Sequence, residues 1–182
     1  MNERVRLVFS GSGGQGVITA AIILAEAAVI HEGKNATQSQ SYGAAARGGA
    51  TRSDIIISDA EINFPEVTQP NILVCLTQEA YTTYSPIIRP GGILLTDSRF
   101  VQTTRKVDAK QIELPMYETV MEKIGKPVVF NICVLGALLG LTDILKPESV
   151  MAAIADRVPK DFLTLNNRAF DLGLVLGAQY RR

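Results

Sequence analysis

The sequence has few of the residues that usually build a reactive centre. Among 182 residues there is one histidine, His31, two cysteines, Cys75 and Cys133, and no tryptophan. One histidine argues against a zinc site, because zinc ligands come largely from histidine and cysteine. Each cysteine lies in its own apolar run, so the pair is expected to be reduced and buried, and cannot supply four thiolates to an iron–sulfur cluster. We therefore expect no metal site and no catalytic residue in this chain.

The sequence also lacks an excess of charge and a long apolar run. Eighteen basic and eighteen acidic residues leave a formal net charge of zero, which argues against nucleic-acid binding. The longest apolar stretches, 17–30 and 128–141, fall short of the ~20 residues that cross a membrane. No signal-peptide pattern precedes the first strand, so a cytoplasmic location is expected. With 47% hydrophobic residues and a mean hydropathy of +0.17, the chain is apolar enough to suggest a partner that covers part of its surface.

Apolar runs of strand length alternate with helical patterns along most of the chain. The expected strands are 5–9, 35–41, 50–57, 71–76, 93–96 and 111–114. The expected helices are 17–30, 78–87, 117–124, 128–141, 147–157 and 160–180, and His31 is expected to stabilise the end of the first. This alternation predicts an α/β fold, with a Rossmann-like, mostly parallel sheet, helices on both faces and a helical C-terminal segment. Residues 1–182 are expected to form a single domain.

A glycine-rich turn separates the first strand from the first helix. It consists of Gly11, Ser12, Gly13, Gly14, Gln15 and Gly16. Bare backbone N–H groups and the positive end of a helix dipole predict an anion site there. The Gly-x-Gly-x-x-Gly spacing is also that of dinucleotide-binding folds, but no acidic residue occurs between Gly33 and Ser53 to hold a ribose. The pattern therefore favours a phosphate site of another type; the alternative is a tight turn that binds nothing.

A second unusual loop joins the second and third expected strands. It reads SYGAAARGGATR over residues 41–52, and its candidate binding residues are Tyr42, Arg47, Gly48 and Gly49. Arg47 has no acidic neighbour in the sequence, so it is suited to a phosphate or carboxylate ligand. The alternative is a solvated surface arginine, and Tyr42 is equally suited to packing.

Three segments together resemble a known family. GSGGQGV after the first strand, SYGAAARGGATRSDIIIS and VVFNICVLGALLG are similar to the gamma subunit of 2-oxoacid:ferredoxin (acceptor) oxidoreductases, and the resemblance covers residues 5–173. It implies a complex that decarboxylates a 2-oxoacid on thiamine diphosphate, passes electrons through iron–sulfur clusters to ferredoxin, and releases an acyl-coenzyme A. Thiamine diphosphate and the clusters would belong to partner subunits: alpha, beta and, as a further candidate, a ferredoxin-like delta.

The resemblance implies that a gamma subunit assists coenzyme A binding and covers the active site. The two glycine loops would supply that partial site. Family members often read Tyr-Gly-Pro-Glu-Met-Arg-Gly-Gly where this chain has Tyr42 to Gly49 with three alanines, a version that favours the 2-oxoglutarate branch. Two alternatives stay open. One is a purely structural docking subunit, and the other is a stand-alone nicotinamide- or flavin-binding oxidoreductase.

Overall fold

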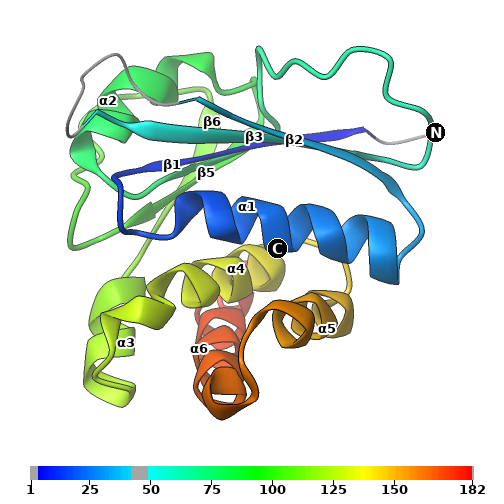
Figure 1. The fold of residues 1–182 in the computed structure, drawn as a ribbon. Coiled ribbons are helices and arrows are strands. Elements are labelled where there is room, and N and C mark those ends of the chain that lie inside the picture. Colours follow the sequence, from blue (N-terminus) through cyan, green and yellow to red (C-terminus); the bar gives the residue numbers. More distant parts are fainter. Residues whose placement is uncertain (1–3, 42–48, 182) are drawn as a thin grey trace.

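A computed structural model describes residues 4–41 and 49–181, which form six strands in one sheet. The strands are β1 (Val5–Gly11), β2 (Asn35–Ser41), β3 (Thr51–Ser58), β4 (Ile72–Cys75), β5 (Gly92–Asp97) and β6 (Ala109–Leu114). Their order is β2-β3-β1-β4-β5-β6, and β3 runs antiparallel to both neighbours while the others run parallel (Figure 1). The expected mostly parallel α/β sheet is confirmed. The exception, β3, follows β2 after only residues 42–50, too short for the crossover that a parallel pair needs.

The helices follow the sequence pattern closely. They are α1 (Val17–Glu26), α2 (Gln78–Tyr84), α3 (Met116–Lys123), α4 (Phe130–Leu141), α5 (Pro147–Arg157) and α6 (Lys160–Ala178), with a π-helical turn η1 (Ala27–His31) and 3₁₀ turns η2 (Ser85–Ile87) and η3 (Pro127–Val129). The expected helix 17–30 is thus α1 followed by η1. The expected helical C-terminal segment is confirmed by α4, α5 and α6.

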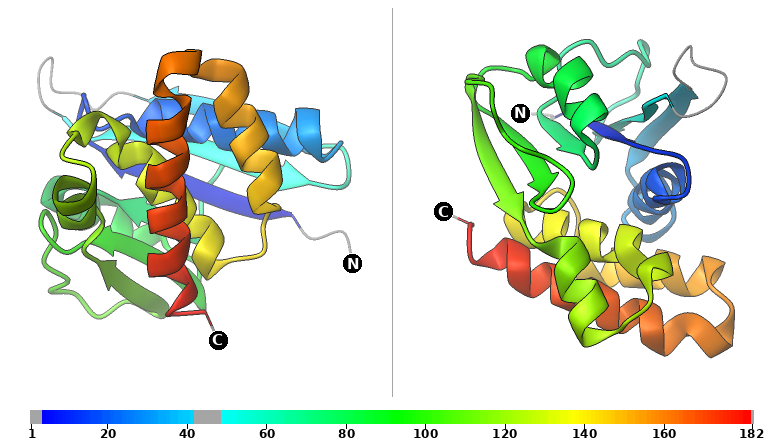
Figure 2. Two further views of the ribbon diagram at one scale, coloured as in Figure 1. Left: turned by 90° about the horizontal axis from the view of Figure 1, so that it is seen from below. Right: turned by 90° about the vertical axis from the view of Figure 1, so that its left-hand side faces the viewer.

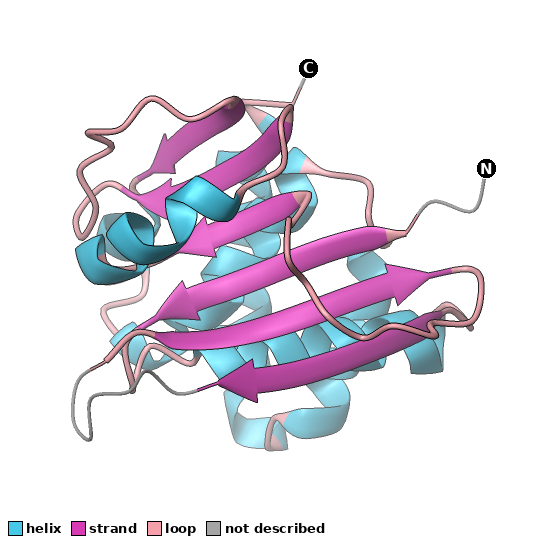
Figure 3. Ribbon diagram, turned by 90° about the horizontal axis from the view of Figure 1, so that it is seen from above, coloured by secondary structure: helices cyan, strands magenta, loops and turns pink. Residues whose placement is uncertain are grey.

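Helices lie on both faces of the sheet, but unequally. Figure 1 shows α1 and α4 directly beneath the sheet, with α5 and α6 farther from it. Figure 3 shows α2 in front of the opposite face. The main core therefore lies between the sheet and the α1–α4 layer, where it includes Phe9, Leu24 and Leu135, all fully buried.

Helix α4 is the centre of the helical layer. All twelve of its residues are buried, as expected for a helix that is apolar on every side. It packs against α6, which lies outermost in the view from below (Figure 2). Glycines allow the close approach: a Cβ on Gly173 would overlap the carbonyl oxygen of Cys133, and one on Gly136 would overlap that of Phe170. In the part of the chain that the structure describes, no helix is long and apolar enough to span a membrane.

Candidate functional site

The glycine turn links the end of β1 to the start of α1 at the carboxyl edge of the parallel strands. Gly14 and Gly16 have φ values of 87° and 72°, a left-handed conformation that side chains disfavour. Gly16 is the N-cap residue that precedes α1, and its carbonyl oxygen accepts the Ala20 N–H at 2.9 Å. A Cβ on Gly16 would also lie 2.6 Å from Nδ2 of Asn131. Gly16 is therefore required both by its conformation and by its packing.

The turn has fewer unpaired backbone N–H groups than the sequence suggested, because the Gln15 side chain folds back into it. Its Oε1 accepts the Ser12 N–H at 2.8 Å, and its Nε2 donates to the carbonyl oxygen of Leu76 at 3.0 Å. A Cβ on Gly11 would lie 2.5 Å from that Oε1 atom. Gly11 thus makes room for Gln15, and one of the N–H groups expected to bind an anion already has a partner.

Gly13 and Gly14 form the open tip of the turn. Both are exposed, and, chain neighbours aside, no atom of the described residues lies within 4 Å of a Cβ built on either. They line a hollow of about 310 Å³ together with Ser12 and Thr51. Backbone of the turn therefore remains accessible to a ligand at this tip.

The structure brings the bases of the two predicted loops together. Gly11 at the end of β1 is paired with Thr51 at the start of β3, so both loops leave the same edge of the sheet. Gly49 is half-buried on the way into β3. The candidate residues Tyr42, Arg47 and Gly48 lie outside the described residues, so their placement stays a sequence-based prediction.

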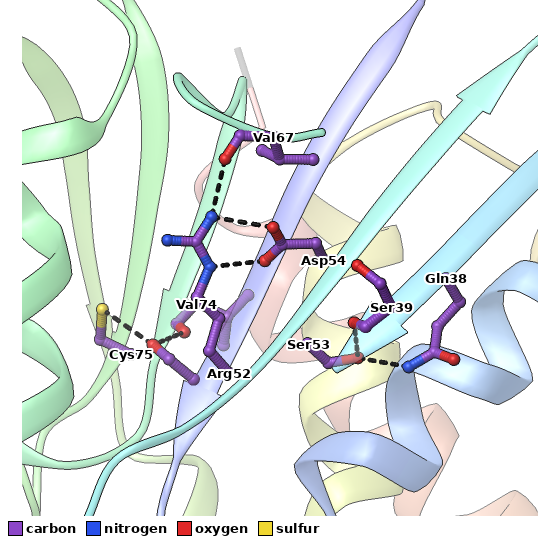
Figure 4. A network of polar contacts seen from close by, with 9 residues as sticks. Gln38, Ser39, Arg52, Ser53, Asp54, Val67, Val74 and Cys75 are labelled. Atoms are coloured by element: carbon purple, nitrogen blue, oxygen red, sulfur yellow. Dashed lines mark hydrogen bonds and ion pairs between the residues drawn. The ribbon is translucent and has the colours of Figure 1, made fainter. Parts of the chain in front are cut away.

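Arg52 anchors the base of the second loop. Its Nε and Nη2 donate to the two carboxylate oxygens of Asp54 at 2.6 and 2.9 Å, and Nη2 also donates to the carbonyl oxygen of Val67 at 2.7 Å (Figure 4). The guanidinium carbon lies 5.3 Å from the centre of the Tyr84 ring. The hydrogen bonds to Asp54 raise the pKa of Arg52 above its usual value despite its partial burial. Arg52 is thus already paired and holds β3 to the segment that follows it.

On its other side, the turn borders an apolar groove of about 610 Å³. Its walls come from three parts of the chain: the turn with α1, residues 127–132 at the start of α4, and residues 157–166 at the α5–α6 corner. Val128 and Phe162 expose 74% and 52% of their surface beside it. Two asparagines, Asn131 and Asn166, are each 8% exposed and are the most buried polar residues of the lining. We call this cavity the Asn131 groove; its volume is within the range of small-molecule sites.

Sequence reasoning missed the Asn131 groove, although one signal was present. Asn131 is the only polar residue in the apolar pattern 128–141, and a lone polar residue in a buried helix usually has a specific partner. Its Nδ2 donates to the carbonyl oxygen of Gly16 at 3.3 Å, which ties α4 to the start of α1. The role of residues 157–166 in the groove could not be foreseen, because it depends on how α5 and α6 meet.

Four other titratable side chains, those of Cys75, Cys133, His31 and Asp97, are either buried or paired with another side chain. Burial raises the pKa of both the Cys75 and the Cys133 thiols to about 12, so neither is a thiolate at neutral pH. His31 Nε2 lies 3.0 Å from Oδ2 of Asp156, an exposed pair that joins η1 to α5. Asp97 is buried at the end of β5 and accepts the Tyr117 N–H at 2.8 Å, where burial raises its pKa. Within residues 4–41 and 49–181, no group of histidine, cysteine and acidic side chains could hold a metal ion.

The sheet order also bears on the nicotinamide alternative. In a dinucleotide-binding fold, the parallel strand beside β1 carries the acid that binds the ribose at its carboxyl end. Here the strand beside β1 on that side is the antiparallel β3, whose carboxyl end, Ser58, lies at the opposite edge. The strand next to β1 therefore does not end beside the Gly11–Gly16 turn, as it does in a nicotinamide site. This agrees with the lack of an acidic residue between Gly33 and Ser53.

Comparison with known sequences places the chain among oxidoreductase subunits. The model of the pyruvate ferredoxin/flavodoxin oxidoreductase family matches residues 6–176. The 2-oxoglutarate synthase subunit KorC of Methanocaldococcus jannaschii is 46% identical over 175 residues, covering 95% of this chain and 92% of that relative. The pyruvate/ketoisovalerate oxidoreductases common subunit gamma of Thermococcus litoralis is 31% identical, covering 84% of this chain and 85% of the relative.

Solved structures agree with these sequence relatives. The gamma subunit of a keto/oxoacid ferredoxin oxidoreductase from Geobacter sulfurreducens has a TM-score of 0.90 and 40% identity, with 99% of each chain covered. A 2-oxoglutarate:ferredoxin oxidoreductase from Magnetococcus marinus, solved with 2-oxoglutarate, coenzyme A and succinyl-CoA bound, shares the fold at a TM-score of 0.88 and 22% identity; 98% of this chain matches 32% of that longer chain. The chain therefore belongs to the pyruvate ferredoxin/flavodoxin oxidoreductase family, as a gamma subunit of a 2-oxoacid:ferredoxin oxidoreductase.

Proposed function

We propose that this gamma subunit helps bind coenzyme A and closes the active site in a complex that converts 2-oxoglutarate to succinyl-CoA. Similarity to several 2-oxoglutarate synthase KorC subunits, at 37–46% identity, supports this choice of 2-oxoacid. The pyruvate/ketoisovalerate relatives are more distant, at 31%. The all-alanine stretch between Tyr42 and Arg47 favours the same branch.

One observation carries the proposed role. The open tip at Gly13 and Gly14, the base of the second loop at Thr51 and the Asn131 groove lie at one edge of the sheet. Among the described residues, this edge has no reactive side chain of its own. Such an edge can bind and cover a substrate but needs a neighbour for chemistry. Thiamine diphosphate and the iron–sulfur clusters would lie on alpha, beta and delta partners. Coenzyme A would contact both this chain and its partners, with its phosphates near Gly13 and Gly14 and beside Arg47.

The common gamma subunit of Thermococcus litoralis is named for two enzymes. This supports different roles for the gamma subunit and for the subunits that select the 2-oxoacid. A subunit shared between a pyruvate and a ketoisovalerate enzyme does not set the choice of 2-oxoacid there. We infer the same for this chain, with 2-oxoacid selection by the thiamine-binding partners.

The sharpest test of the proposed role is Arg47→Ala in the reassembled complex. A charge-assisted hydrogen bond contributes roughly 1.5–3 kcal/mol, so the KM for coenzyme A should rise about 10- to 100-fold while the KM for 2-oxoglutarate stays unchanged. Arg89→Ala is the control, because Arg89 is exposed and lies beside the start of β5 at the opposite edge of the sheet. An unchanged KM for coenzyme A would exclude a role for Arg47.

A purely structural docking role is the second candidate, and the Gln15 side chain favours it. With the Ser12 N–H already satisfied, the turn has one donor fewer for a phosphate. In that case the complex would need this chain for assembly, and no variant at the sheet edge would change the KM for coenzyme A selectively.

A further inference from the structure

The β2 side of the sheet ends in a strand that lacks the usual features that prevent further pairing. We propose that the outer edge of β2, together with the outer side of α1 and η1, binds the same surface of a second copy of this chain. Pairing of the two β2 strands would join two sheets into one. This inference does not depend on the proposed role in coenzyme A binding.

The two edge strands of the sheet differ in their side chains. β6 carries two exposed charges, Lys110 and Glu113, and Nζ of Lys110 donates to the Tyr180 carbonyl oxygen at 2.6 Å. β2 reads Asn-Ala-Thr-Gln-Ser-Gln-Ser and contains neither a charge nor a proline. Its seven residues pair with β3 in unbroken register, without a bulge. Charges, prolines and bulges are the common means by which sheet edges avoid further pairing, and β2 has none of them.

The backbone of β2 offers hydrogen-bonding groups along this edge. In an antiparallel pair, alternate residues direct their N–H and C=O groups away from the partner strand. Among the described strands, β2 pairs with β3 alone, and Figure 3 shows it as the outermost strand on its side of the sheet. The outward groups are therefore placed to pair with a further strand.

Beneath β2, the outer side of α1 and η1 is apolar. Ile18, Ile22, Ala25 and Val29 follow one another at intervals of four, three and four residues, which places them along one side of a helix. The first three are half-buried, and Val29 exposes 47% of its surface. The next residue, Ile30, exposes 64%. We call these five residues the α1 stripe.

The α1 stripe lies on the side of the helix that faces away from α4 and α5. Thr19 and Ile23 line the Asn131 groove together with the start of α4, and Glu26 accepts a hydrogen bond from Arg157 of α5. At 100° per residue, these three residues lie about a quarter turn or more around the helix from the middle of the stripe. Figure 2, in its right-hand view, shows α1 below β2 at the margin of the molecule.

An uncharged surface of this kind favours a copy of itself. One residue in five of the chain is charged, yet β2 and the α1 stripe contain no charged residue. A two-fold axis brings a surface against itself, so like charges there would repel each other. A two-fold axis perpendicular to the sheet would make the two β2 strands antiparallel, and the two α1 helices beneath them as well. Strand then meets strand, and stripe meets stripe.

The size of the surface fits a weak dimer. Seven residues of strand extend about 23 Å, and the sheet and helix layers together are about 20 Å high. Two copies would thus bury about 1,000 Å², the least that a specific interface needs. We therefore expect a dissociation constant in the micromolar range.

The test is sedimentation equilibrium of the full-length chain from about 1 to 100 µM. The wild-type chain should form dimers. Ile22→Lys should raise the dissociation constant about 10- to 100-fold, because the interface would bury two like charges. Ser39→Lys should have the same effect from an exposed position on β2, which makes it the second variant if Ile22→Lys does not fold by circular dichroism. Val175→Lys is the matched control, since Val175 is 61% exposed on α6.

A wild-type chain that stays monomeric over the whole range would overturn the proposal. So would folded Ile22→Lys and Ser39→Lys chains that dimerise as well as the wild-type chain, because the contact would then lie elsewhere. A monomeric wild-type chain whose assembly with the other subunits is lost in Ser39→Lys would assign this surface to those subunits instead. The coenzyme A dependence of the complex tests the proposed function separately.

Discussion

At the residue scale, two of the four glycines in the Gly11–Gly16 turn are explained by packing inside the chain. Gly11 leaves room for the Gln15 amide, and Gly16 accommodates both a left-handed conformation and the side chain of Asn131. The Gly-x-Gly-x-x-Gly spacing therefore arises here from packing inside the chain as well as from any ligand. As far as the described residues show, the tip at Gly13 and Gly14 is open.

The first prediction concerns Gly16. Gly16→Ala should lower the free energy of unfolding by about 2–4 kcal/mol, because it adds left-handed strain and a clash with Asn131. Gly13→Ala is the control, since it has open space and no positive φ, and should change stability by less than about 0.5 kcal/mol. Urea unfolding of both variants measures the difference. Equal stabilities would mean that Asn131 does not restrict the turn.

The second prediction concerns the two buried thiols. Burial raises the pKa of Cys75 and Cys133 from 9.0 to about 12, so folding favours the protonated thiols. This contribution to stability is fully present below pH 9 and is lost as the pH rises toward 12, by about 1 kcal/mol per thiol between pH 9 and pH 10. The Cys75→Ala, Cys133→Ala double variant should show a smaller decrease over that interval in urea titrations. An identical pH dependence would contradict the assigned burial.

At the scale of elements, α4 and α6 form one unit through paired small residues. Gly136 and Gly140 of α4 face backbone of α6, and Gly173 and Gly177 of α6 face backbone of α4. Close approach here lets α6 cover a helix whose every residue is buried. The same packing positions the α5–α6 corner, and with it Phe162 and one wall of the Asn131 groove.

The third prediction concerns Gly173. Gly173→Ala would improve helix propensity, yet its methyl group would overlap backbone atoms of Cys133 and Ala137, which cannot turn aside. We expect a net loss of about 3 kcal/mol in the free energy of unfolding. Val175→Ala, at an exposed site on the same helix, should be nearly neutral. A stabilised Gly173→Ala chain in thermal unfolding would show that the two helices can separate at little cost.

At the scale of the whole molecule, the chain forms a surface that is incomplete by itself. The turn tip, the base of the second loop and the Asn131 groove lie along one edge, while large apolar side chains such as Val128 and Phe162 remain exposed near it. Exposed apolar side chains at a rim are typical of a surface that meets another protein. The subunit character of the family members agrees with this arrangement.

The fourth prediction concerns the isolated chain. The purified polypeptide, given 2-oxoglutarate, coenzyme A, thiamine diphosphate and an electron acceptor, should not reduce the acceptor, because its thiols are buried and protonated and His31 is paired with Asp156. Addition of the partner subunits should restore turnover, measured as acceptor reduction and succinyl-CoA formation. Sustained turnover by the solitary chain would refute its role as a non-catalytic subunit.

The sequence by itself determined the elements and the family. Alternation of apolar runs with helical patterns located all six strands to within about two residues, because local periodicity reports which side of an element is buried. The split of 17–30 into α1 and η1 was missed, since a π-helical turn has no periodicity signal of its own. Three short motifs were enough to indicate the gamma-subunit family.

Tertiary structure alone decided how those pieces form a site. Three features depend on contacts between residues that are distant along the chain or lie in different elements. They are the hydrogen bond of the Gln15 side chain to Leu76, the antiparallel direction of β3, and the position of Asn131 and Asn166 in one groove. Such contacts depend on how helices and strands pack, and packing is set by the summed shape of many side chains rather than by any local pattern. For this reason the glycine turn was visible in the sequence, whereas the groove beside it was not.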